Sequence, residues 1–91
     1  MRVDLFLKWS RILKRRSLAK ELCDEGAVLL NGRYVRAGHE VAVGDEIILN
    51  LRNRKLCVQL LDLPERVPSA ARARELYLVS KDERIDEVER V

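Results

Sequence analysis

The chain has 91 residues, of which 47% are apolar and 36% are charged, and its net charge is +3. By the usual size relation it forms one domain that buries only about 60–65% of its unfolded surface. A core this small leaves little room for a deep active-site pocket, so we expect no enzyme activity. The longest apolar runs, such as 27–30, have four residues, which excludes a transmembrane helix of about 20 residues.

The N-terminal residues and the two cysteines indicate a cytoplasmic protein. Asp4 and Lys8 interrupt the apolar residues at the start of the chain, unlike the continuous apolar segment of a signal peptide. Cys23 and Cys57 lie in apolar surroundings and form no C-x-x-C pair, which is typical of reduced, buried cysteines. We therefore expect a cytoplasmic location and no membrane partner.

Positive charge is concentrated at the N-terminal end. Residues 1–55 carry a net charge of +5 and residues 56–91 a net charge of −2. The first 20 residues contain seven basic side chains and one acid, Asp4. Such a density of like charge is costly unless an anion binds it, and the phosphate backbone of a nucleic acid is the commonest such partner. The alternative is a solvated face with no ligand.

A first helix is predicted to begin at Asp4, whose side chain can cap it and pair with a nearby arginine. The apolar residues that follow recur at the helical period and predict one buried stripe. The stripe contains Leu5, Phe6, Trp9, Ile12 and Leu13. If the helix continues past Ser10, Lys8, Arg11 and Arg15 gather on its other side within about 60° of one another; Ser10 could instead interrupt the helix. The tryptophan of the stripe is expected to pack in the core rather than to stack on a nucleobase.

A second helix is predicted to begin at Ser17, a good N-cap, and to stop at Gly26. Its buried stripe contains Leu18, Ala19, Leu22 and Cys23. Arg15 and Arg16 immediately precede its first turn. The backbone amides at the start of a helix, flanked by guanidinium groups, form a natural binding site for phosphate.

The pattern changes from helical to strand-like after the second helix. Residues 27–30 and 33–36 are predicted to form a β-hairpin around a type I′ turn at Asn31-Gly32. The later predicted elements, in chain order, are a turn at 43–46, a strand at 47–51, a turn at Asn53, a strand at 56–61, a helix capped by Ser69 through Glu75, and a strand at 76–79. We expect the charged segment 80–91 to be frayed, or helical on a partner.

The order of these signals resembles the S4 domain, an RNA-binding domain first described in small-subunit ribosomal protein four. The resemblance is carried by four motifs: Arg2-x-Asp4-x-x-Leu7, Arg15-Arg16-Ser17-x-Ala19, Gly26-x-Val28-x-x-Asn31-Gly32 and Val43-Gly44-Asp45-x-Ile47. It implies an α+β fold with two N-terminal helices packed on a small twisted antiparallel sheet, a short C-terminal helix and a charged tail. Residues 1–62 would form the S4-type RNA-binding domain and residues 63–91 a C-terminal extension.

The resemblance also implies an RNA surface made of the basic helical face, the start of the second helix and the hairpin. Its side chains in this sequence would be Arg2, Lys8, Arg11, Lys14, Arg15, Arg16, Ser17, Lys20, Asn31, Arg33 and Arg36. A guanidinium binds two phosphate oxygens at once and stacks on exposed bases, so the abundance of arginine fits this use. His39 has no partner at ligand spacing, and no nucleophile–base set or glycine-rich phosphate loop is present, so we predict no metal, no cofactor and no catalytic residue.

Over the whole chain the resemblance is greatest to the stand-alone bacterial S4 proteins of the RqcP type, with the short heat-shock ribosome-binding proteins second. It implies a non-catalytic factor of ribosome-associated quality control that binds obstructed large ribosomal subunits through rRNA and peptidyl-tRNA. The factor would hold the tRNA while a tailing factor on the same particle adds C-terminal alanine to the stalled chain. It implies no small-molecule substrate, and we expect a monomer.

Three other functions stay open at this point. The heat-shock relatives imply a rescue factor for free large subunits that carry nascent chains. The domain could also be the RNA-binding subunit of a separate RNA-modification enzyme. Finally, the charged segment 80–91 could serve a protein-binding adaptor.

Overall fold

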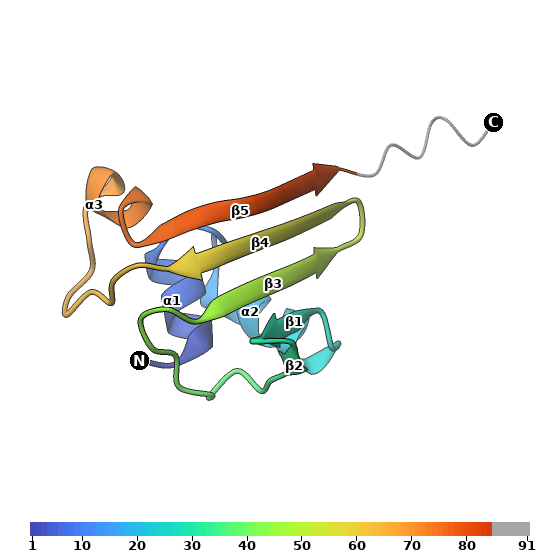
Figure 1. Ribbon diagram of the computed structural model, residues 1–91. Helices are drawn as coiled ribbons and strands as arrows, with labels where there is room; N and C mark the ends of the chain where they lie inside the picture. The colour runs from blue at the N-terminus through green and yellow to red at the C-terminus, as the bar shows by residue number, and fades with distance from the viewer. Residues whose placement is uncertain (85–91) are drawn as a thin grey trace.

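The computed structural model describes residues 1–84. Its elements, in chain order, are α1 Val3–Trp9, α2 Arg16–Asp24, β1 Val28–Leu30, β2 Arg33–Tyr34, β3 Glu46–Leu51, β4 Arg54–Leu60, α3 Ala70–Arg74 and β5 Tyr77–Arg84. The strands form one antiparallel sheet in the order β2-β1-β3-β4-β5, and α1 and α2 lie on one side of it (Figure 1). This is the predicted α+β fold. Among the described residues, no helix has both the length and the apolar character needed to cross a membrane.

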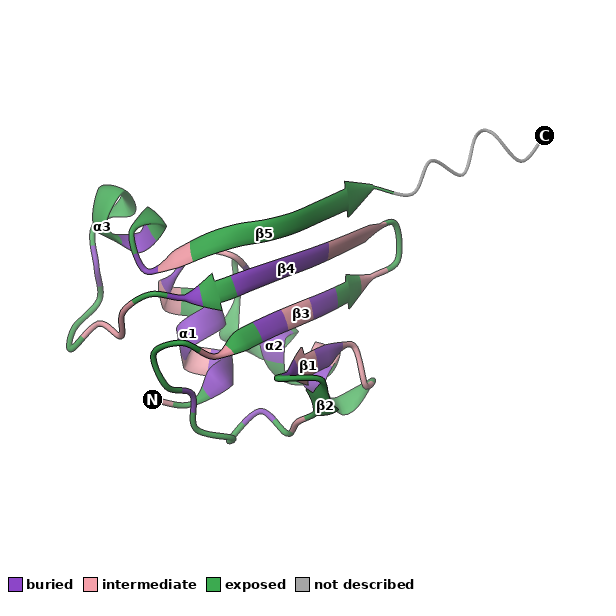
Figure 2. Ribbon diagram, viewed as in Figure 1, coloured by how far each residue is buried: buried purple, intermediate pink, exposed green. Residues whose placement is uncertain are grey.

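The core lies between the two N-terminal helices and the sheet. Val3, Phe6 and Leu7 of α1 are fully buried, and the spacing of these residues places them on one side of a helix. From the sheet, Ile47 and Leu49 of β3 are buried while their neighbours along the strand are more exposed (Figure 2). Burying each such side chain contributes roughly 1.5–3 kcal/mol, so this contact fixes how the helices sit on the sheet.

The first helix is short, and one part of the predicted stripe is wrong. α1 ends at Trp9, and the hydroxyl of the buried Ser10 donates to the carbonyl oxygen of Leu7 at 3.3 Å. The interruption considered at Ser10 is therefore confirmed. Leu5 and Trp9 are only half-buried, whereas Val3 and Leu7 are fully buried, so the buried side of α1 is formed by Val3, Phe6 and Leu7.

Both predicted N-caps of the first two helices are wrong. The N-cap positions are Arg2 for α1 and Arg15 for α2, and neither side chain makes a capping hydrogen bond. Asp4 and Ser17 instead lie in the first turns. The carboxylate of Asp4 instead joins the two helix starts by binding Arg16, the first residue of α2.

The end of the second helix is as predicted. Gly26 has φ +73°. Its N–H donates to the carbonyl oxygen of Cys23 at 3.1 Å, and the N–H of Ala27 donates to the carbonyl oxygen of Leu22 at 2.8 Å. This is the Schellman arrangement, for which glycine is the favoured residue. Leu18 was expected in the buried stripe, but it is 37% exposed, because it lines a surface hollow beside the α1–α2 turn.

The hairpin turn and the short C-terminal helix confirm two local predictions. Asn31 and Gly32 have φ +51° and +83°, as a type I′ turn requires. The return strand β2 is shorter than predicted and ends at Tyr34. At α3, the hydroxyl of Ser69 accepts from the N–H of Arg72 at 3.1 Å, as an N-cap does.

The last strand corrects the expectation of a frayed segment from residue 80. β5 continues through Arg84 and pairs with β4, with a register irregularity at Cys57/Val58. Two contacts explain the pairing: Ser80 donates from its hydroxyl to the carbonyl of Cys57 at 3.2 Å, and Arg54 binds Asp82 through two hydrogen bonds of 2.8 Å. Residues 85–91 lie outside the described residues. The division of the chain at residue 62 stays a prediction. The sheet contains strands from both sides of this residue, because β5 pairs with β4.

The cysteines behave as predicted. Cys23 and Cys57 are both buried and unpaired. Burial raises the pKa of the Cys23 thiol, and the nearby carboxylates of Asp4 and Asp24 raise it further. This thiol therefore stays protonated at neutral pH.

Candidate nucleic-acid interface

Asp4 joins the starts of the two N-terminal helices. Its side chain is only 4% exposed. Oδ1 accepts from the N–H of Leu5 at 2.8 Å and from Nε of Arg2 at 3.2 Å, and Oδ2 accepts from Nη2 of Arg2 and Nε of Arg16, both at 3.2 Å. Two of the sequence motifs thus meet in one cluster. We call Arg2, Asp4 and Arg16 the Asp4 cluster.

The Asp4 cluster holds two of the predicted RNA-binding arginines without burying them. The side chains of Arg2 and Arg16 are 49% and 46% exposed. Each guanidinium turns part of its donor set toward the carboxylate and leaves the rest to solvent. One carboxylate for two arginines leaves the cluster with a net positive charge. The pairing of Asp4 with a nearby arginine is as predicted.

Five other predicted cations near the two helices carry no carboxylate partner among residues 1–84. They are Lys8, Arg11, Lys14, Arg15 and Lys20, and all five are exposed. Nζ of Lys8 donates to the carbonyl oxygen of Lys14 at 3.0 Å, across the turn between α1 and α2. We call these five residues the helical cations. Since none of the five is neutralised by a carboxylate of residues 1–84, their charge is available to an external anion.

The turn between α1 and α2 changes how the helical cations are arranged. Lys8, Arg11 and Arg15 would share one side of the first helix only if that helix continued past Ser10. In the structure α1 ends at Trp9, and Arg11 lies in the turn with φ +64°, so the condition for a single helical face is not met. The three side chains instead come from the last turn of α1, the connecting turn and the N-cap of α2.

The hairpin adds a second group of cations next to the Asp4 cluster. Arg33 and Arg36 are exposed and line one hollow together with Tyr34, which is 71% exposed. The loop that follows is bonded to the start of α1: the N–H of Val3 donates to the carbonyl of His39 at 2.7 Å. A β-carbon added at Gly38 would lie 3.7 Å from the guanidinium carbon of Arg2. The hairpin loop and the Asp4 cluster are therefore neighbours.

Asn31 is exposed, but its side chain is already used within the fold. Its Oδ1 accepts from the N–H of Glu46 at 2.9 Å, and its Nδ2 donates to Oδ1 of Asp45 at 3.0 Å. Oδ2 of Asp45 accepts from the N–H of Ala42 at 2.8 Å. These bonds join the Asn31-Gly32 turn to the start of β3, so Asn31 positions the hairpin. Ser17 is exposed and lines the hollow beside the α1–α2 turn.

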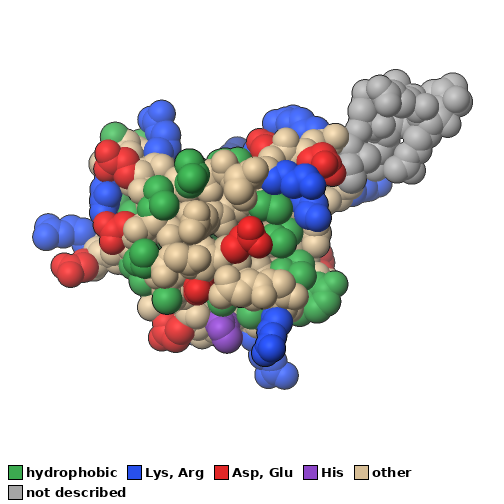
Figure 3. Space-filling model, viewed as in Figure 1, with side chains coloured by type: hydrophobic (Ala, Val, Ile, Leu, Met, Phe, Trp, Pro, Cys, Tyr) green, Lys and Arg blue, Asp and Glu red, His purple; other side chains and the backbone are tan. Residues whose placement is uncertain are grey.

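The open side of the sheet offers no comparable concentration of positive charge. Viewed from this side, lysines and arginines lie mainly around the rim, while hydrophobic, acidic and other side chains and the backbone occupy the centre (Figure 3). At the start of β4, Arg54 is paired with Asp82 of β5. The helical cations and the hairpin cations are therefore the strongest candidate for a nucleic-acid interface.

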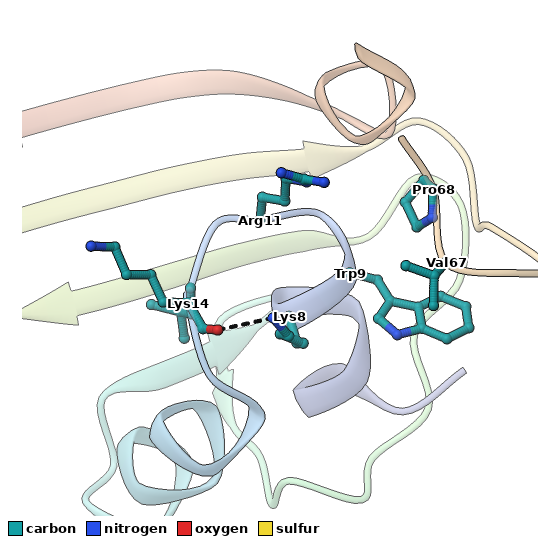
Figure 4. Close-up of a pocket in the computed structure, with 7 residues that line it drawn as sticks. Lys8, Trp9, Arg11, Lys14, Val67 and Pro68 are labelled. Atoms are coloured by element: carbon teal, nitrogen blue, oxygen red, sulfur yellow. Dashed lines mark hydrogen bonds between the residues drawn. The ribbon is translucent and has the colours of Figure 1, made fainter. Parts of the chain in front are cut away.

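One neighbour of this interface was missed by the sequence analysis. Val67 and Pro68 lie beside Trp9 and line a pocket of about 400 Å³ together with helical cations (Figure 4). Nothing in the local sequence around Val67 and Pro68 signals this contact, since nearly 60 residues separate them from Trp9. Only the return of the chain after β4 brings the two segments together.

Comparisons with known proteins agree with this geometry. The S4 domain family matches residues 1–47. Curated proteins named "RQC P-site tRNA stabilizing factor" are similar along nearly the whole chain: that of Halalkalibacterium halodurans is 40% identical over 98% of this chain and 100% of its own, and that of Bacillus subtilis is 37% identical over 96% of this chain and 100% of its own.

Two solved structures share the fold. A trimeric structure of Vibrio cholerae heat shock protein 15 superimposes with a TM-score of 0.79 at 26% identity, covering 88% of this chain and 81% of that one. The solution structure of a hypothetical protein gives a TM-score of 0.77 at 32% identity, covering 91% of this chain and 100% of that one. Sequence, fold and full-length similarity agree: the chain belongs to the S4 domain family and, within it, to the group of small proteins that includes the RQC P-site tRNA stabilizing factors.

Proposed function

We propose that this protein is a non-catalytic RNA-binding factor of bacterial ribosome-associated quality control, acting in the cytoplasm. It binds obstructed large ribosomal subunits through rRNA and peptidyl-tRNA and stabilises the tRNA while a tailing factor extends the stalled chain with alanine. The observation that carries the proposal is the full-length similarity to proteins whose name states tRNA stabilisation. The exposed helical cations, which no carboxylate of residues 1–84 neutralises, supply the matching chemistry.

The geometry of the cations suits folded RNA. Structured RNA is recognised mostly by its shape and by phosphate and 2′-hydroxyl contacts. A rigid set of cations on two helices and a hairpin meets that need without reading base sequence. If the surface neutralises four to six phosphates, the logarithm of the binding constant falls with the logarithm of salt with a slope of roughly −3 to −5.

The test is a pull-down of the tagged full-length protein with charge-removal variants. Arg15 and Lys14 are exposed, and neither has a carboxylate partner among residues 1–84, so their substitution removes charge without breaking an internal ion pair. We expect Lys14→Ala with Arg15→Ala to lower recovery of large-subunit rRNA and tRNA about tenfold. Arg52→Ala, in the exposed turn between β3 and β4, is the matched control and is expected to stay within about twofold.

Two results would overturn the proposal. Recovery of neither large-subunit rRNA nor tRNA by the wild-type protein would remove the partner. Recovery that the double variant leaves unchanged at physiological salt would place the RNA on another surface. Arg2→Ala and Arg16→Ala are also expected to weaken subunit binding, but these changes break the Asp4 cluster too, so they need a parallel measurement of stability.

A second candidate is a rescue factor for free large subunits that carry nascent chains. The structural similarity to a heat shock protein with the same fold favours it. The two candidates differ in one product. Cells that lack the protein are expected to lose alanine tails on stalled peptides under the first candidate and to keep them under the second.

A further inference from the structure

The pocket beside Trp9 combines a flat apolar surface with positive charge. Its apolar lining consists of Trp9, Leu13, Val67 and Pro68, and its polar lining consists of Lys8, Arg11 and Lys14. Among residues 1–84, no acidic side chain lines it. In Figure 4 the indole lies next to Val67 on one side of the pocket, and the lysines lie on the other.

Two of the four apolar residues of this pocket are not explained by the core. Leu13 and Pro68 are buried, but Trp9 is half-buried and Val67 is 70% exposed. The core cluster contains Leu13 and fully buried side chains such as Phe6, but neither Trp9 nor Val67. A single exposed apolar side chain is ordinary, but Val67 lies next to the indole of Trp9 in a pocket that cations also line.

The cationic part is held in place by the fold. Nζ of Lys8 is bonded to the carbonyl of Lys14. Arg11 has a left-handed backbone at the position after the helix, where glycine is the usual residue. The buried Ser10 and Leu13 on either side impose this conformation, and the N–H of Leu13 donates to the carbonyl of Leu7 at 3.0 Å. Backbone strain that the surrounding structure maintains is frequent at binding sites.

We propose that this pocket takes one unpaired nucleotide of the bound RNA. The base of that nucleotide lies against Trp9 and Val67, and the backbone phosphates beside it lie near Lys8, Arg11 and Lys14. The inference rests on the proposed function and adds a site to it. A base in a duplex is stacked between its neighbours, so only an unpaired or splayed-out base can enter. Base–aromatic stacking tolerates any base, because every base has a π-face.

Charge favours RNA over a peptide as the occupant. The pocket is continuous with the helical cations, three of which line it. A polyanion whose charge extends beyond the pocket gains from Arg15, which lies beside Lys14, as well. A short acidic segment of a protein would use only part of this field.

The experiment uses Trp9 as its own reporter, since it is the only tryptophan of the chain. The full-length protein is titrated with a short oligoadenylate, and tryptophan emission is recorded alongside the anisotropy of labelled oligoadenylate. Inorganic polyphosphate is the base-free control. We expect oligoadenylate to quench the emission saturably, and polyphosphate to bind without comparable quenching.

Two matched variants test the pocket itself. Val67→Asp places a charge in the pocket and is expected to lower oligoadenylate affinity about tenfold and to remove most of the quenching. Val43→Asp makes the same change at another exposed valine, which is 60% exposed and outside the pocket, and is expected to leave both readouts within about twofold. Both positions are exposed, so both variants should fold, as circular dichroism can verify.

Three results would overturn the inference. The first is oligoadenylate binding, seen by anisotropy, without quenching. The second is quenching that Val67→Asp leaves unchanged. The third is quenching by polyglutamate in place of oligoadenylate, which would make an acidic protein segment the occupant. The proposed function survives the first two results if large-subunit rRNA and tRNA are still recovered in the pull-down, so the failures of the two proposals are distinguishable.

Discussion

Replacing Asp4 by asparagine tests whether the Asp4 cluster holds the two helix starts together. An amide can keep the Oδ1 contacts to Leu5 and Arg2, but an NH2 group in place of Oδ2 cannot accept from Arg2 or Arg16. Two charge-assisted hydrogen bonds are lost. Such bonds contribute about 1.5–3 kcal/mol each, and the half-exposed guanidiniums regain water, so the effect is reduced.

We expect Asp4→Asn to lower the free energy of unfolding by about 1–2 kcal/mol. For a domain of this size, that corresponds to a fall in Tm of roughly 5–15 °C. Urea and thermal unfolding, followed by circular dichroism, measure it. The matched control is Asp24→Asn at the end of α2, an exposed acid in no ion pair among the described residues, for which we expect a change within about 0.5 kcal/mol. A Tm for Asp4→Asn equal to that of wild type would refute the role assigned to the cluster.

Three further predictions concern stability and reactivity. The Arg54 guanidinium holds the pKa of Asp82 below its usual range. This pair therefore stabilises the fold at pH values above the unfolded aspartate pKa of about 4, and the stabilisation is lost as the pH falls through the lower folded pKa. Arg54→Gln should therefore make the free energy of unfolding depend less steeply on pH in acid. Asn31→Ala removes two side-chain hydrogen bonds and places alanine at φ +51°, which should cost about 1–3 kcal/mol in urea unfolding, whereas Asn53→Ala should cost under about 0.5 kcal/mol. Because burial raises the pKa of Cys23, a thiol reagent should label the native protein slowly and the urea-unfolded protein at once; equal rates would contradict its burial.

The elements that the sequence predicted well are those determined by a few adjacent residues. The type I′ turn at Asn31-Gly32, the helix stop at Gly26 and the cap at Ser69 each depend on a local conformational preference. They were found from the residues concerned, without knowledge of the rest of the fold.

The errors lie where a distant contact decides the structure. The strand character of residues 80–84 depends on Arg54, 28 residues before its partner Asp82, so charge alternation alone suggested a frayed end. The end of α1 depends on burying Ser10 and Leu13, which turns the chain at Arg11 against its backbone preference. Periodicity cannot reveal either effect, because it describes one segment at a time.

The candidate site shows the same division. All eleven predicted RNA-binding residues are exposed, because charge density alone predicts exposure. Their internal partners were harder to predict. The sequence suggested that Asp4 would pair with an arginine, but it gave no sign that one carboxylate would bind two of them or that Asn31 would be used to hold the hairpin.

The Asp4 cluster also explains how a small domain can carry so much positive charge at one end. An acid among cations lowers the charge available to RNA, which by itself weakens binding. It also reduces repulsion between the two helix starts and fixes the directions of Arg2 and Arg16 before RNA arrives. Side chains already ordered lose less entropy on binding, so orientation offsets part of the lost charge. Lys8 follows the same principle through its bond to the Lys14 carbonyl. The surface therefore combines cations that internal bonds order, such as Lys8, with cations such as Arg15, which have no carboxylate partner among residues 1–84.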